Sequence, residues 1–207
     1  MATPNGSVVQ ADSVRLLAAL SRLEQIWREQ RAPIVGALAS GLSPEQFDPR
    51  LTGLPFRIPE ELQILWSWHN GLLPGIQRND ARYSVGPGWY TFLSLEDAVR
   101  TYWQQLAIHS QDVARFVGGP LHVWGSDWLV LFAQDAECVI VRADESGPGE
   151  VSPVRLVSYE WDDFDRDRTE SVTQLIERWN DAFESGCYRW SGDDWLVDVS
   201  NPAHVPL

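Results

Sequence analysis

Residues 53–71, GLPFRIPEELQILWSWHNG, constrain the fold more strongly than any other segment of the chain. Pro59 suits the first position of a helix, because its φ is fixed and it has no N–H to leave unpaired. Asn70 and Gly71 are typical of a helix end. At ~100° per residue, the apolar side chains between them cover most of the helix circumference. The segment therefore predicts a helix over residues 59–70 that is buried on most sides.

Two neighbouring stripes of large side chains form the buried part of this predicted helix, and a narrow polar wedge forms the rest. The first stripe consists of Leu62, Leu65, Trp66 and His69, and the second of Ile64 and Trp68. The polar wedge consists of Glu60, Gln63 and Ser67. We expect His69 to complete the first stripe and to form a local hydrogen bond.

The composition indicates one substantial hydrophobic core. The chain has 207 residues, of which 44% are hydrophobic, and this length suits a single domain. We expect the domain to span residues 12–199, between a flexible N-terminal tail over residues 1–11 and a C-terminal tail over residues 200–207.

The charge balance favours a basic protein as the partner. With 29 acidic residues against 16 basic ones, the net charge is -13, which disfavours binding to nucleic acid or to an anionic membrane. Every basic residue is an arginine. The absence of lysine excludes a P-loop lysine, Schiff-base catalysis and a serine nucleophile paired with a lysine.

Cysteine usage and hydropathy indicate the compartment. Cys138 and Cys187 fit no CxxC or zinc-finger spacing, and we interpret them as free thiols in a reducing compartment. The N-terminus has no signal-like apolar core, and the longest apolar run, residues 128–133, is too short to span a bilayer. We therefore expect a cytoplasmic protein that makes no membrane contact and is a monomer or a weak dimer.

Capping and turn residues predict the other elements of the N-terminal half. Asp12 or Ser13 can cap a helix that runs to about residue 30, and Ser43, followed by Pro44 and Gln46, predicts a short capped helix. Residues 72–88 are turn-rich and predict a surface loop with a short strand at 82–85. A strand at 89–93 and a helix that starts at Ser94 follow, with apolar positions 95, 98, 99, 102, 103 and 106 in helical register.

Apolar runs of strand length dominate the next part of the chain. Residues 121–124, 128–132 and 138–143 predict strands, and the second and third predict an antiparallel hairpin in the middle of a covered sheet. A strand at 154–159, an amphipathic helix over 172–183 closed by Gly186, and edge strands at 188–190 and 195–199 complete the pattern. The predicted fold class is α+β, with a largely antiparallel sheet of about five to six strands packed by helices.

Short motifs follow one another in a fixed order from about residue 14 to residue 190. They are Leu42-Ser-Pro-Glu-Gln46, Leu54-Pro55, Ile58-Pro59-Glu-Glu-Leu62, His69-Asn70-Gly71 and Phe92-Leu-Ser94-Leu95-Glu-Asp-Ala98, and then Trp124, the strand at 128–132, the turn at Gly149 and the helix that ends at Gly186. Their joint order resembles the signature of the SUKH superfamily, the Smi/Knr-like proteins. The resemblance implies structural roles for thirteen residues, which are Leu54, Pro55, Pro59, Leu62, Leu65, Trp66, Asn70, Gly71, Ser94, Leu95, Trp124, Gly149 and Gly186.

The resemblance implies an α+β fold without catalytic residues or a cofactor. It also implies a role common in bacteria, that of an immunity protein which neutralises a cognate polymorphic toxin, often a nuclease. Eukaryotic members resemble regulators of cell-wall assembly, which leaves a regulatory scaffold as the alternative. The chain departs from the family pattern at Ala136-Glu137, where many relatives have a Gly-Asp or Gly-Asn turn, and in its acidic insert and its extension past Trp190.

Two acidic segments with interleaved aromatic residues are the candidate partner-binding sites. The first consists of Glu160, Trp161, Asp162, Asp163, Phe164, Asp165 and Asp167, and the second of Asp193, Asp194 and Trp195. A dense negative surface with aromatic anchors can occupy the phosphate-binding cleft of a basic toxin. The alternative for the first segment is a solvated loop that leads into a helix.

The eleven tryptophans raise a third hypothesis, a carbohydrate-binding protein, because indole rings stack on sugar faces. Trp27, Trp66, Trp103 and Trp179 are in phase with helical apolar stripes, and Trp124 and Trp128 belong to predicted strands; Trp89, Trp161, Trp190 and Trp195 remain as possible exposed platforms.

Enzyme signatures are weak in this sequence. His109 and Asp112 can share a helical face, whereas His69, His122 and His204 are isolated, so we expect no metal site. Neither a nucleophile elbow nor a glycine-rich phosphate loop occurs. The sequence therefore favours a binding protein over an enzyme.

Overall fold

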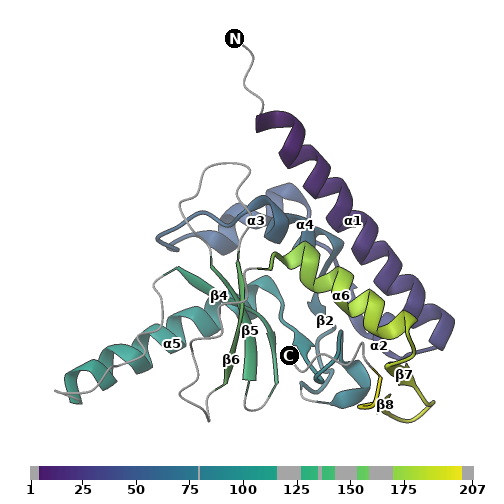
Figure 1. Cartoon of the computed structure of the whole chain (residues 1–207). Coiled ribbons are helices and arrows are strands. Elements are labelled where there is room, and N and C mark those ends of the chain that lie inside the picture. Colours follow the sequence, from purple (N-terminus) through teal and green to yellow (C-terminus); the bar gives the residue numbers. More distant parts are fainter. Residues whose placement is uncertain are drawn as a thin grey trace.

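The computed structural model describes residues 5–78, 80–115, 127–134, 137–142, 153–158 and 170–201. Helices and antiparallel strands both contribute to it, which confirms the α+β class (Figure 1). Outside the described residues lie the predicted strand at 121–124 with Trp124, the turn at Gly149 and the acidic segment 160–167.

The helices are α1 (Asn5–Gln30), α2 (Ile34–Ala37), α3 (Pro44–Leu51), α4 (Glu60–Trp68), α5 (Leu95–Arg115) and α6 (Val172–Glu184), together with the 3-10 turn η1 (Ala81–Tyr83). The strands are β1 (Leu38–Ser40), β2 (His69–Leu72), β3 (Thr91–Phe92), β4 (Trp128–Ala133), β5 (Glu137–Arg142), β6 (Val154–Ser158), β7 (Tyr188–Trp190) and β8 (Trp195–Val197). No described helix combines the length and the apolar character that crossing a membrane requires.

The main sheet has the strand order β3-β4-β5-β6, and all of its pairs are antiparallel. The predicted hairpin is confirmed: Val130 lies opposite Ile140, and a register irregularity follows before Phe132. The four inner residues of β4 are all buried, so both faces of this strand are covered. A continuous apolar run is typical of a strand in that position.

The prediction of a single sheet of five to six strands, however, is wrong for the described residues. β1 pairs only with β2, and β7 pairs only with β8, in two separate two-stranded sheets. The turn after Trp190 returns the chain directly along β7, and buried Trp195 packs on Phe183 of α6, with ring centroids 5.3 Å apart. The β7-β8 hairpin is therefore attached to a helix and not to the edge of the main sheet.

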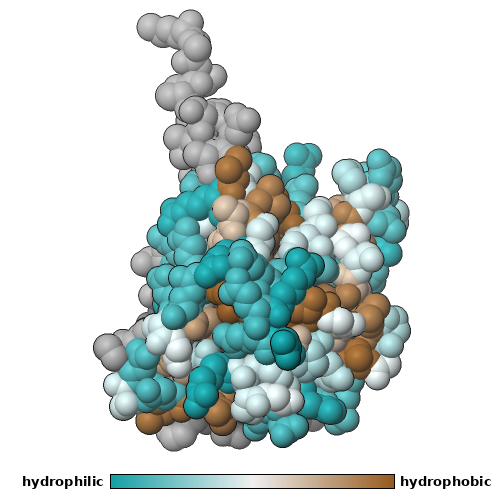
Figure 2. Space-filling model, turned by 90° about the vertical axis from the view of Figure 1, so that its right-hand side faces the viewer, coloured by the Kyte–Doolittle hydropathy of each residue, from teal (hydrophilic) through white to brown (hydrophobic). Residues whose placement is uncertain are grey.

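Helices α1 and α6 lie side by side and run in the same direction (Figure 1). Their shared interior contains Leu20 and Trp27 of α1 and Trp179 of α6, all nearly inaccessible to solvent. Arg15 pairs with Glu177 along the outer seam. Figure 2 shows the side of the molecule to which these helices belong, where hydrophobic residues occur in separate patches among hydrophilic ones.

Three predicted boundaries differ from the structure. α1 begins at Asn5, so residues 5–11, which we expected in the tail, are helical. Residues 81–83 form a 3-10 turn and not a strand, because Asp80 caps them by accepting a hydrogen bond from the Arg82 backbone N–H at 3.1 Å. α4 ends at Trp68, and His69 is already extended, with φ -147° and ψ 146°.

Candidate functional site

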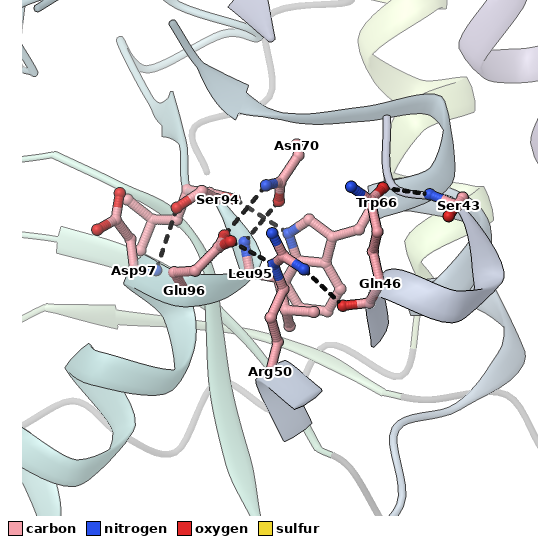
Figure 3. A network of polar contacts seen from close by, with 10 residues as sticks. Ser43, Gln46, Arg50, Trp66, Asn70, Ser94, Leu95, Glu96 and Asp97 are labelled. Atoms are coloured by element: carbon pink, nitrogen blue, oxygen red, sulfur yellow. Dashed lines mark hydrogen bonds and ion pairs between the residues drawn. The ribbon is translucent and has the colours of Figure 1, made fainter. Parts of the chain in front are cut away.

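Asn70 connects strand β2 to the start of helix α5 (Figure 3). Its side-chain oxygen accepts a hydrogen bond from the Leu95 backbone N–H at 2.8 Å, and its side-chain nitrogen donates to Glu96 Oε2 at 3.0 Å. One short amide thus satisfies an otherwise unpaired N–H at the helix start and orients the neighbouring carboxylate.

Gly71 has a different role from the predicted one. It does not terminate the helix but lies inside β2, with φ +72°. A Cβ at this position would lie 2.4 Å from the Ser94 backbone nitrogen. The close crossing of two backbones therefore requires glycine, both for its missing side chain and for its left-handed conformation.

The start of α5 follows the sequence prediction. Ser94 precedes the helix, and its hydroxyl oxygen accepts a hydrogen bond from the Asp97 backbone N–H at 3.1 Å. Behind it, the indole N–H of buried Trp66 donates to the Leu93 carbonyl at 3.0 Å. Trp66 thereby connects α4 to the segment that enters α5.

Arg50 of α3 completes a set of contacts that we call the polar node, consisting of Arg50, Asn70, Ser94, Leu95 and Glu96. Its guanidinium donates to Glu96 Oε1 and to the Gln46 carbonyl (Figure 3). Burial by itself would raise the pKa of Glu96, but hydrogen bonds from Arg50 and Asn70 outweigh it, and the pKa lies below its ordinary value. The node joins α3, β2 and α5 through one ionised carboxylate.

A groove of about 420 Å³ opens beside the polar node. One wall is formed by Leu72 at the end of β2 and by Leu73 and Ile76 of the loop that follows, and strand β3 provides Phe92. The polar part of the lining is Asn70, Arg78, Thr91, Ser94, Glu96 and Asp97. The groove thus combines an apolar wall with a polar end.

The carboxylate of Asp97 contacts two guanidinium groups. Arg78 lies on its Oδ2 and Arg100 on its Oδ1. The side chain of Arg78 is 45% exposed and that of Asp97 is 20% exposed. The groove therefore has a partly exposed guanidinium, that of Arg78, and a carboxylate, that of Asp97, which is already paired with arginines.

The second predicted acidic site is present only in part. Asp193 and Asp194 are exposed in the turn between β7 and β8, as a docking surface requires. The prediction that Trp195 is an exposed aromatic anchor is wrong, because this residue is 6% exposed and packs in the interior. The first acidic segment lies outside the described residues, so its relation to this turn stays a prediction.

The turn itself is well ordered by hydrogen bonds. The Ser191 hydroxyl accepts from the backbone N–H groups of Asp193 and Asp194 at 3.4 and 3.1 Å. Asp194 Oδ1 accepts from the Trp195 N–H at 2.8 Å. Trp190 lies against Trp195 with ring centroids 5.4 Å apart. The two carboxylates therefore lie on a short hairpin whose turn is held by hydrogen bonds and by the contact between two tryptophan rings.

The structure corrects the assignment of Trp103 and bears out those of several other tryptophans. Trp103, predicted to pack, is 46% exposed, because it lies at the edge of the buried face of α5. Trp89 is 48% exposed, as predicted for a possible platform, and has φ 60°, a left-handed conformation that is uncommon outside glycine. Trp27, Trp66 and Trp179 are buried as predicted.

In the described part of the chain, the histidine and cysteine side chains form no group that could hold a metal ion. His69 does not complete a helical stripe, and its ring nitrogen Nδ1 lies 2.8 Å from the Ala39 carbonyl of β1, so it bonds to a distant strand and not locally as expected. Cys138 and Cys187 are buried and form no disulfide. Within the described ranges, no cluster of three or more His, Cys, Asp or Glu side chains is arranged to hold a metal ion.

Sequence reasoning missed the arginines of this region. Arg50, Arg78 and Arg100 are far apart in the chain and have no motif in common. The only local signal is the Ser-Leu-Glu-Asp piece at residues 94–97, which we interpret as a helix start and as one of the resembling motifs.

No model of a known protein family matches this chain, and no curated protein matches it in sequence.

Proposed function

We propose that the chain is a non-enzymatic protein-binding module of the SUKH type. In this proposal it is a bacterial immunity protein that docks an acidic face onto a basic toxin, such as a nuclease, and occludes its active site. The observation that carries the proposal is the Asp193-Asp194 turn, whose exposed carboxylates form no ion pair with any residue of the described ranges.

The distribution of arginines supports a negative docking surface. In the described part of the chain, carboxylates already pair with Arg15, Arg22, Arg28, Arg50, Arg78, Arg82, Arg100 and Arg178. Paired charges largely cancel at a distance, whereas the unpaired carboxylates of the hairpin turn contribute to the long-range field. Such a field accelerates association with a basic partner, and salt weakens it.

The construction of the hairpin also suits binding. Trp195 packs on Phe183 and Trp190, and the Ser191 hydroxyl fixes the turn. A surface that is ordered before binding loses little conformational entropy when the complex forms. Rigid presentation therefore favours a dedicated partner.

The polar node supports the same proposal, because it contains residues of the motifs that resemble the SUKH superfamily. Asn70, Gly71, Ser94 and Leu95, which belong to the resembling motifs, join strand β2 to the start of helix α5. Residues with this role stabilise a scaffold. They leave the exposed loops and turns to determine which protein is bound.

The first test is coexpression of the chain with the product of a neighbouring toxin-like gene. The proposal predicts that cells survive and that the two proteins copurify at low salt. Neither protection nor a complex at low salt would remove the immunity function. A complex with several cell-wall assembly proteins, without protection, would favour the regulatory scaffold instead.

The second test uses charge-neutralising variants. Asp193→Asn/Asp194→Asn should slow association several-fold, with a smaller change in dissociation, because rim charges act mainly on the encounter. Asp181→Asn on α6 is the matched control, since this carboxylate is also exposed and lies outside the turn. A second variant, with Asp162, Asp163 and Asp165 changed to Asn, tests the first acidic segment. Unchanged far-UV circular dichroism shows that folding is intact.

One observation favours a second candidate function, carbohydrate binding. Trp89 keeps about half of its surface exposed and adopts φ 60°, a conformation that costs about 1–3 kcal/mol for a residue other than glycine. Strain at an exposed aromatic residue is typical of ligand contacts. Titration with cell-wall oligosaccharides would change the tryptophan fluorescence of the protein but not of Trp89→Ala, and no change in either would reject this function.

A further inference from the structure

The groove beside the polar node differs in charge from the rest of this acidic chain. Two carboxylates line it, Glu96 and Asp97, and both are occupied by guanidinium groups. Three arginines contact these two carboxylates, namely Arg50, Arg78 and Arg100. Counted together, these three arginines and two carboxylates have a net charge of +1, and Arg78 is the arginine among them that lines the groove.

Arg78 is the member of this group that can bind a ligand. It lines the groove, its side chain is 45% exposed, and its one ion pair among the described residues is with Asp97. A guanidinium has five N–H donors in a planar fork that matches a carboxylate. Because Arg100 also contacts Asp97, Arg78 can turn toward a second carboxylate without leaving the first one unpaired.

The other wall of the groove selects an apolar group. Leu73 and Phe92 both line the groove, and their residues are 42% and 1% exposed. A volume of about 420 Å³ falls within the range of ligand sites. An occupant should therefore place an apolar side chain on this wall and a carboxylate on Arg78. Both groups should belong to a ligand about the size of one amino-acid residue.

We infer that the groove binds the free C-terminus of a partner polypeptide that ends in an apolar residue. The terminal carboxylate pairs with Arg78, and the last side chain packs on Leu73 and Phe92. Only the final residue of a polypeptide has an apolar side chain and a carboxylate on the same carbon atom. This site prefers a negative ligand, so it is separate from the proposed acidic docking face, and its tests do not depend on a toxin.

The test compares the peptide acetyl-Gly-Ser-Ala-Leu as free acid and as C-terminal amide by isothermal titration calorimetry with the full chain. The acid should bind about tenfold more tightly than the amide, because a charge-assisted bidentate contact is lost in the amide. N-acetyl-leucine serves as a third ligand. It should bind more weakly than the peptide, because it has no preceding residues to contact the loop after β2.

Two variants assign the preference to the groove. Arg78→Gln should remove the difference between acid and amide, and Leu73→Ser should weaken the binding of the acid. Arg57→Gln is the control, because Arg57 is exposed and has no ion pair among the described residues. Circular dichroism and the thermal midpoint check that each variant folds.

Several outcomes would overturn the inference. They are equal binding of acid and amide, no binding of the acid at millimolar concentration, and an acid preference that survives Arg78→Gln in a folded protein. Equally tight binding of N-acetyl-leucine would show a site for small carboxylic acids and would also contradict a polypeptide ligand.

Discussion

Replacing Gly71 by alanine should destabilise this protein more than the same change at any open glycine. The new Cβ would lie 2.4 Å from the Ser94 nitrogen, 2.8 Å from the Ser94 Cα and 2.9 Å from the Leu93 carbonyl carbon. All three atoms belong to the backbone, so no side chain can rotate away. β2 or the start of α5 must move instead, and the hydrogen bonds of Asn70 would be disturbed with it.

The expected loss has two parts. Overpacking against a fixed neighbour costs about 1–3 kcal/mol, and the left-handed conformation at φ +72° adds about 1–2 kcal/mol for a residue with a Cβ. The sum, about 2–5 kcal/mol, is a large share of a total stability of about 5–15 kcal/mol. Gly71→Ala should therefore lower the urea midpoint strongly.

The matched control is Gly53→Ala. Gly53 also has a positive φ, +93°, but nothing lies within 4 Å of its Cβ position, so only the conformational part of about 1–2 kcal/mol applies. Urea unfolding, followed by tryptophan fluorescence, measures both free energies. Equal losses in the two variants, or a loss below about 1 kcal/mol for Gly71→Ala, would refute the close-crossing argument.

Three further predictions concern the node and the hairpin. Asn70→Ala should cost about 1–3 kcal/mol of unfolding free energy, because it leaves the Leu95 N–H without its partner; a loss within error in urea unfolding would contradict this. The pKa of Glu96 is lowered in the folded state, so its stabilising contribution is present above the unfolded pKa of about 4.3 and is lost as the pH falls through the folded value. Glu96→Gln should flatten the fall in urea midpoint below that pH, and an unchanged acid profile would count against the assignment. Trp195→Ala should cost about 3–5 kcal/mol, because this ring is 6% exposed; near-wild-type thermal stability would show that the hairpin is not stapled to α6.

The sequence predicts the elements whose signals are local. The start of α5 at Ser94 follows from a serine ahead of a run with helical periodicity, and the structure shows the cap. The β4-β5 hairpin follows from two apolar runs of strand length. In α4, Glu60, Gln63 and Ser67 are exposed, as the polar wedge of the sequence predicts. Such signals survive because the side chains and backbone involved are close in the chain.

The failures have a physical cause in common. His69 and Gly71 were assigned to a helix end, because Asn-Gly is typical of one; β1, some thirty residues earlier, instead draws residues 69–72 into a strand by pairing Leu38 with Leu72. Only the folded chain brings β1 to this place. Local propensity cannot contain that information.

Of the candidate sites, the one with a local sequence signal could be predicted and the one formed by distant segments could not. Asp193 and Asp194 are exposed at a turn, as charged turn residues usually are. The groove could not be predicted, because Arg78 and Phe92 come together only when the loop after β2 lies beside β3. A surface assembled from separate segments needs the tertiary structure to be seen.

The most direct measurement of the central claim is the association rate with the neighbouring toxin-like protein as a function of ionic strength. Steering by unpaired carboxylates predicts a rate that falls steeply with added salt, and a smaller salt dependence in Asp193→Asn/Asp194→Asn. A rate independent of salt in both proteins, or no binding at low salt, would contradict the claim that this chain acts through a negative docking surface.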